Sequence, residues 1–146
     1  MTAITVANTL SASQENIWTL IKNDSTVLSF TKNILDGVPV GLTRGTGFPY
    51  VIVPTPTITA GAWRTLAHRD EFLTFKIEVF DRKESVMRKL CDAIRNVLET
   101  NRVAFATENG MYQYFNTSTD MTYVVEEDNS IVYNYTITVK YQWWDC

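Results

Sequence analysis

The sequence predicts an α+β protein whose sheet has about four to five strands, antiparallel or mixed, with two main helices packed on one face. Three observations support this fold class. Residues 71–81 alternate apolar and polar side chains, which is typical of a half-buried strand. Residues 84–98 then change to helical spacing of apolar residues. Residues 131–141 alternate again over a stretch longer than most strands, which favours a central or curved position.

The first helix is expected to start near Ser11 or Ser13, because either hydroxyl can cap a helix N-terminus. Residues 23–25 (Asn-Asp-Ser) indicate a break, and residues 26–33 offer a second, short helical piece. Residues 36–47 contain repeated glycines and predict a turn-rich connection. The apolar residues of the first helix are Ile17, Trp18, Leu20 and Ile21.

A strand of β-branched residues is predicted over residues 48–53, with Pro49 near its start, where proline is tolerated. Residues 55–70 are expected to form a long polar connection. The strand at residues 71–81 follows. Its core-facing positions are Leu73, Phe75, Ile77 and Val79.

The main helix at residues 84–98 is expected to start with a capping-box-like pair formed by Asp81 and Glu84. Its outer side is basic, which is consistent either with a solvated face or with a partner-binding face. The apolar stripe consists of Val86, Leu90, Ile94, Val97 and Leu98, and the basic residues are Arg82, Lys83, Arg88, Lys89 and Arg95.

The last third of the chain predicts two or three strands. Residues 101–109 are expected to be a loop or weak strand that ends on an Asn-Gly turn signal. A strand follows at residues 111–116, and a short strand at 123–125 precedes a charged turn at 126–129.

Composition limits the class of protein. The 146 residues suit one domain spanning 1–146, and 20% charged residues are ordinary for a globular chain. A net charge of −3 argues against tight binding to phosphate backbones. No run approaches the ~20 apolar residues of a membrane span, and the N-terminus lacks a signal-peptide pattern. We therefore expect cytosolic synthesis and no membrane association.

The sequence contains little that suggests chemistry. His68 is the single histidine; it could be a general base oriented by a neighbouring carboxylate, or an exposed residue in a polar connection. Cys91 is expected to pack in the core. Gly41, Gly45 and Gly47 precede a strand, whereas phosphate-binding loops follow one. We expect no enzyme, no cofactor and no metal site.

Aromatic residues gather near the end of the chain. Trp143 and Trp144 are adjacent, so in a strand they point to opposite faces, and at least one is expected outside the core. An intersubunit role and simple core packing both remain open for them. The same alternatives apply to Trp63 in the 55–70 connection.

The order of elements resembles the tail-terminator (tail-completion) proteins of tailed bacteriophages. The resemblance rests on the early helix at residues 17–24 with its short continuation, and on the glycine- and proline-containing connection into Phe-Pro-Tyr-Val-Ile-Val at 48–53. It rests also on the strand ending at Phe80-Asp81 that enters a helix, and on the long final strand. It covers essentially the whole chain, except that residues 55–70 and the Trp-Trp ending do not map onto the family.

The resemblance implies a ring, commonly a hexamer, at the head-proximal end of the tail tube. Such a ring stops tube polymerisation and presents a docking surface to neck proteins of the head. It implies as partners further copies of the chain, the tail tube protein, a neck or head-completion protein, and the sheath protein if the tail is contractile. DNA would pass through the lumen without specific binding. The location would be the tail or neck of the virion, after assembly in the host cytoplasm.

The residues selected for subunit interfaces are Trp63, Arg64, Lys76, Glu78, Arg88, Trp143 and Trp144. Two other classes compete with a terminator. One is another phage neck protein, either a head-closure or a head–tail adaptor protein. The other is a small binding module unrelated to virions.

Overall fold

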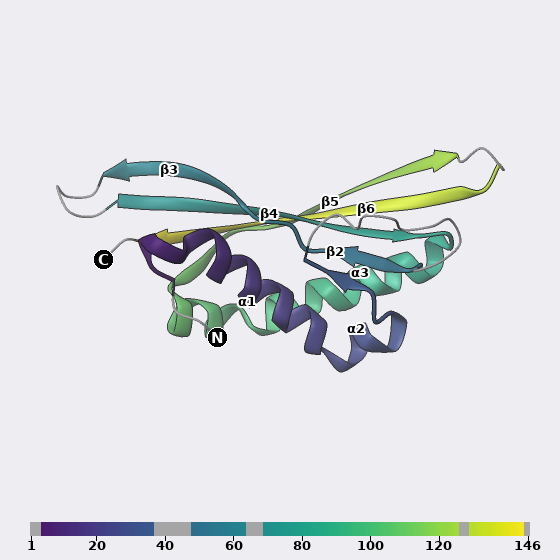
Figure 1. Ribbon diagram of the computed structural model, residues 1–146, viewed down its shortest axis with the longest axis horizontal. Coiled ribbons are helices and arrows are strands. Elements are labelled where there is room, and N and C mark those ends of the chain that lie inside the picture. Colours follow the sequence, from purple (N-terminus) through teal and green to yellow (C-terminus); the bar gives the residue numbers. More distant parts are fainter. Residues whose placement is uncertain (1–3, 37–47, 64–68, 126–128, 145–146) are drawn as a thin grey trace.

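The computed structural model describes residues 4–36, 48–63, 69–125 and 129–144, apart from the side chains of residues 6, 60–63, 69, 70, 113–120 and 144. The described chain forms one sheet with helices on one face (Figure 1). The strand order is β1-β2-β4-β6-β5, and β3 pairs with β4 beside this path. Six strands exceed the four to five expected. The expected α+β class and the placement of both main helices on one face are confirmed.

The strands are β1 (Ile34–Leu35), β2 (Tyr50–Ile52), β3 (Thr57–Trp63), β4 (Arg69–Asp81), β5 (Met111–Val125) and β6 (Ile131–Trp144). The sheet is mixed, because β1 and β2 are parallel and all other pairs are antiparallel. The centre of the sheet is the β4–β6 pair, whose register runs without interruption from Asp70 opposite Trp144 to Asp81 opposite Tyr133. The final strand is therefore central, as its length predicted.

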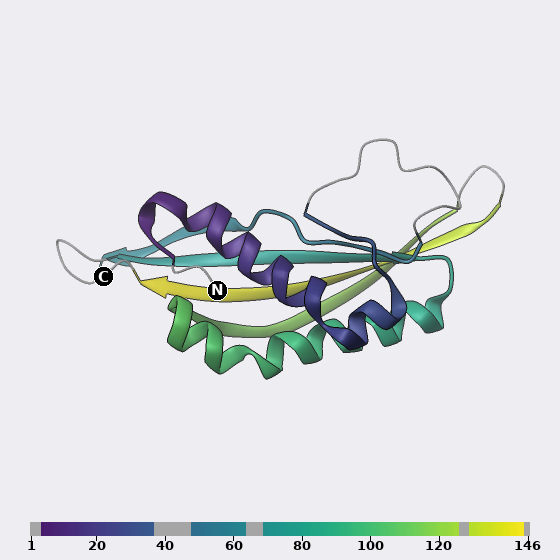
Figure 2. The same cartoon turned by 60° about the horizontal axis from the view of Figure 1, so that its bottom comes forward.

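The main helices are α1 (Thr9–Asn23), preceded by the 3-10 turn η1 (Val6–Asn8), and α3 (Glu84–Thr100). Three short elements complete the helical layer: α2 (Ser25–Phe30), α4 (Arg102–Ala104) and η2 (Phe105–Asn109), which is a turn of π-helix. Figure 2 shows α1 and α3 crossing the sheet side by side. The break between α1 and α2 lies where it was predicted, at Asp24, whose carboxylate accepts a 3.0 Å hydrogen bond from the Val27 backbone N–H.

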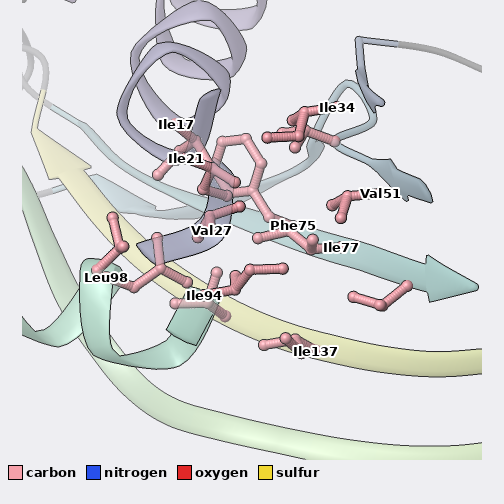
Figure 3. Packing of buried hydrophobic residues seen from close by; sticks show 14 of the residues in the cluster. Ile17, Ile21, Val27, Ile34, Val51, Phe75, Ile77, Ile94, Leu98 and Ile137 are labelled. Carbon is pink, nitrogen blue, oxygen red and sulfur yellow. The ribbon is translucent and has the colours of Figure 1, made fainter. Parts of the chain in front are cut away.

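The core lies between the helices and the inner face of the sheet (Figure 3). The alternation of β4 is confirmed, because its four odd-numbered apolar side chains from Leu73 to Val79 are fully buried. Each such side chain contributes about 1.5–3 kcal/mol through the apolar area it removes from water. The helices supply Ile17 and Ile21 from α1, Val27 from α2, and Leu90, Ile94 and Leu98 from α3.

The main helix α3 begins at Glu84, as predicted, but the capping residues expected for both helices are wrong, and α1 starts earlier than expected. The helix α1 begins at Thr9, and Ser13 lies inside it, donating its hydroxyl to the Thr9 carbonyl. The helix α3 has Lys83 at its N-cap without a side-chain hydrogen bond, and Asp81 is buried with its carboxylate accepting from the Arg82 N–H at 2.7 Å. Serine and aspartate hydroxyl and carboxyl groups satisfy local backbone groups in several ways, so their presence alone does not place a cap.

Other expected boundaries also change. The 55–70 segment is not one polar connection, because residues 57–63 form β3 and residue 69 begins β4. The two strands expected at 111–116 and 123–125 are parts of the single strand β5. Residues 102–109 are helical rather than a loop or strand, and Gly110, at φ +73°, makes the predicted turn into β5. The predicted strand at 48–53 is reduced to residues 50–52.

Candidate assembly surfaces

Two of the selected residues lie on the outer face of the sheet, away from the helices. Lys76 is exposed opposite Thr138, and Glu78 is half-buried opposite Thr136. The outer face also carries an aromatic stack, in which the Tyr50 and Phe80 rings lie 4.7 Å apart between centroids. This face is thus mixed, with threonines, both signs of charge and aromatic rings.

Arg88 is exposed on α3, where it borders a hollow of about 150 Å³ with Asp92, Arg95, Cys91 and Tyr135. Burial raises the pKa of the Cys91 thiol to about 12, with a further contribution from the negative charge of Asp92. The thiol is therefore protonated at neutral pH and is a poor nucleophile. The packing role expected for Cys91 is confirmed.

The tryptophans give a correction. Trp143 is 4% exposed and belongs to the core cluster, so it is not available for contacts between subunits. Its position opposite Met111 and Glu71 directs it to the helix side of the sheet, as the odd-numbered residues of β6 are directed. The Trp144 and Trp63 side chains lie outside the described part, although both backbones are in strands. Arg64 and His68 lie wholly outside the described residues.

A surface that the sequence analysis did not select lies at the far end of the β5–β6 hairpin. Here an apolar group, which we call the distal hairpin patch, is exposed: Met121 at 45%, Tyr123 at 63%, Val124 at 60%, Val125 at 55% and Ile131 at 38%. The hairpin extends beyond the helices (Figure 1). It also extends beyond β4, which ends at Asp81, opposite Tyr133. Apolar side chains on both faces of one hairpin end are an unusual feature of a subunit surface.

A signal for this patch was present in the sequence. The run Tyr123-Val124-Val125 breaks the alternation of apolar and polar residues, so both faces of the strand become apolar there. Such a run is normally covered on both sides. In the described structure, helices cover one side of the sheet only, and they end before the hairpin does (Figure 2).

At the opposite edge of the sheet, α1 borders an open groove of about 550 Å³. Two side chains fasten the helix there: the Gln14 amide donates to the Val53 carbonyl at 3.0 Å, and the Trp18 indole N–H donates to the Ile34 carbonyl at 3.0 Å. The groove is lined by Leu10, Ser11, Gln14, Glu15, Trp18, Asp36 and Thr55. The carboxylates of Glu15 and Asp36 make the groove acidic. The hydrogen bonds from Gln14 and Trp18 fix the position of α1 relative to the strands beside it.

Within the described ranges, no group of three or more histidine, cysteine, aspartate or glutamate side chains is placed to hold a metal ion. None of the helices in these ranges is long and apolar enough to span a membrane.

No protein-family model matches the sequence, and no curated protein matches it. In structure, the chain is similar to a chain in the virion of a native gene transfer agent particle. The TM-score is 0.57, the similarity covers 88% of this chain and 93% of that chain, and the sequence identity is 13%. At this identity, the similarity shows that the two chains share a fold.

Proposed function

We propose that this protein is a structural virion subunit that assembles as a hexameric ring at the head-proximal end of a phage-like tail. The ring caps the tail tube, stops its polymerisation and provides the surface to which the head or neck docks. The protein acts by binding its partners in a symmetric ring, without catalysis or a cofactor. A ring requires two different surfaces on each subunit that fit each other and close after a full turn.

The distal hairpin patch is the observation that carries the proposal. Exposed groups of large apolar side chains on soluble subunits commonly mark sites of association. Tyrosine and methionine are enriched at the centres of such sites, and the patch contains both, at Tyr123 and Met121. In a ring, the patch would be covered by a neighbouring subunit or by the next ring of the tail.

Two further observations support a virion role. The fold is shared with a chain of the virion of a native gene transfer agent particle, so this architecture occurs in a virion. The net charge of −3 also suits a channel wall, because DNA would slide past it without being held. In this role the partners are the tail tube protein, a neck or head-completion protein, and a sheath protein if the tail contracts. The subunit would be made in the host cytoplasm and end in the virion.

Light scattering and electron microscopy of the purified protein test this function. We expect a particle of six 16.7 kDa chains, about 100 kDa in total, that appears as a ring. Mixed with tail tubes, the rings should bind at one tube end. A monomer at micromolar concentrations that leaves both tube ends bare would overturn the proposal. A ring that binds only isolated neck complexes would favour a head-closure or adaptor protein.

A further inference from the structure

The strand β5 forms one edge of the sheet, since β6 is its single partner among the described strands. Its first half is irregular, with register shifts between Gln113 and Ser118. Its second half, residues 118–125, is regular and pairs residue by residue with β6 from Thr138 to Ile131. The edge of this regular half that faces away from β6 therefore presents a regular row of backbone N–H and C=O groups.

This edge lacks the features by which proteins usually prevent strand addition. Natural edge strands carry lysine, proline, bulges or inward charges, because a bare edge pairs with other chains. Residues 118–125 contain no lysine, arginine or proline, and Asp120 is their single charged residue. The distal hairpin patch flanks the same backbone on both faces, so a strand added here would also bury apolar area.

The other side of the sheet presents a second edge strand, and this one carries no charged residue. The strand β3 pairs with β4, and no further described strand pairs with it. Its sequence, Thr-Ile-Thr-Ala-Gly-Ala-Trp, contains no charged residue and no proline, and residues 57–60 pair regularly with β4 before the register shifts between Ala60 and Trp63. The remaining edge strand, β1, is two residues long and lies next to Asp36, so it is far less suited to accept a strand.

We propose that residues 118–125 of one subunit add to the β3 edge of a second copy of this chain, so that the sheets of neighbouring subunits join. This inference rests on the proposed ring and names the segments that form its interface. It deepens that proposal, because β5 and β3 are different surfaces on opposite edges, which is what a head-to-tail contact requires.

The strand directions fit this pairing. Because β4–β6, β5–β6 and β3–β4 are all antiparallel, β5 and β3 run in opposite directions within one sheet. Two subunits placed edge to edge in the same orientation would therefore form an antiparallel ladder. The exposed side chains of Thr122 and Thr59 lie on the same outer face, opposite Asn134 and Phe72 respectively, so the faces also agree.

The two segments lie at different heights along the strands. The strand β3 pairs with the start of β4, at residues 69–74. Residues 118–125 lie across β6 from the last part of β4, from Lys76 to Asp81, and continue past its end. Neighbouring subunits would thus be staggered by about eight residues, or ~26 Å at ~3.3 Å per residue. A closed arrangement of staggered strands requires that the strands tilt strongly from the ring axis.

Disulfide trapping tests the pairing directly. The sequence has two cysteines, the buried Cys91 and Cys146, so the background for this test is Cys146→Ser. In this background, Thr122→Cys and Thr59→Cys proteins are made separately, mixed and oxidised mildly. The proposal expects covalent dimers that contain one chain of each kind, and no comparable product from either protein alone. A product from Thr122→Cys alone would show that β5 pairs with itself, and no product in an assembled ring would show that the interface lies elsewhere. Either result overturns the inference.

Edge protection gives a second test. We expect Thr122→Lys and Thr59→Lys each to raise the protein concentration needed for half-assembly at least about tenfold, because a charge blocks the edge. Thr19→Lys, on the exposed side of α1, is the matched control and should assemble normally. If the unmodified protein forms rings and both edge variants do so equally well, this interface is wrong and the proposed function stands. If the unmodified protein is monomeric, the proposed function itself fails.

Discussion

Replacing Tyr123 by serine removes the aromatic side chain of the distal hairpin patch, which is 63% exposed. An aromatic side chain presents roughly 200 Å², so about 125 Å² of it is open to solvent in the subunit. Burial of that area by a neighbour is worth at most ~3 kcal/mol at ~25 cal/mol per Å². Since ~1.4 kcal/mol corresponds to a tenfold change, the variant should associate up to about a hundredfold more weakly.

The assay is sedimentation velocity over a range of protein concentrations, with the mass of the species as the readout. Circular dichroism and thermal unfolding at concentrations where both proteins are monomers should show little difference, because exposed substitutions usually change the free energy of unfolding by ~0.5 kcal/mol or less.

Two exposed valines test whether weaker association comes from the patch or from the loss of any exposed apolar side chain. Val124 in the patch and Val103 on α4, at the other end of the molecule, are 60% and 67% exposed. Val124→Ser should weaken association, whereas Val103→Ser should leave it unchanged. Equal behaviour of Tyr123→Ser and the unmodified protein at every concentration would refute the reasoning about the patch.

Three further predictions concern stability and reactivity. The Tyr141 hydroxyl is buried without a hydrogen-bond partner among the described residues, and burial raises its pKa. Tyr141→Phe should therefore leave the free energy of unfolding unchanged or raise it by about 1 kcal/mol in urea titrations. A loss of more than ~1 kcal/mol would show that the hydroxyl has a partner. Burial raises the pKa of the Cys91 thiol from 9.0 to about 12. The protonated thiol therefore favours the folded state below pH 9, and this stabilisation is lost as the pH rises toward 12, because the unfolded chain releases the proton first. In a Cys146→Ser background, the native protein should therefore react negligibly with a thiol reagent at pH 8, and fast reaction would contradict the burial of Cys91. Asp24→Ala removes the cap that holds the Val27 N–H and should cost about 0.5–2 kcal/mol in thermal unfolding, with an unchanged midpoint as the contrary result.

The parts of the fold that could be predicted are those with a strong period. The strand β4 alternates without exception between Leu73 and Val79, and the stripe of α3 repeats over several turns. Even there, the buried side of α3 includes Met87 and Cys91, while Val86 is half-buried, because one apolar position at a helix start does not define the stripe.

The parts that could not be predicted depend on tertiary pairing. The strand β3 contains the run Ala-Gly-Ala, whose residues are depleted in strands, and it forms because β4 offers an edge beside it. The burial of Trp143 depends on β4 and β5 reaching far enough to pair with it, at Glu71 and Met111, so that the inner, odd-numbered face of β6 stays covered beyond Tyr141. The distal hairpin patch depends on how far the hairpin extends past the helices. The sequence predicted two short strands in place of β5, so it did not predict a hairpin of this length.

The central claim is that this subunit ends the growth of a tail tube. The most direct measurement adds the purified protein to polymerising tail tube protein and follows tube length by electron microscopy. The account predicts that growth stops at substoichiometric amounts and that one ring is seen on one end of each tube. Tubes that continue to lengthen at saturating protein, with no density at either end, would contradict it.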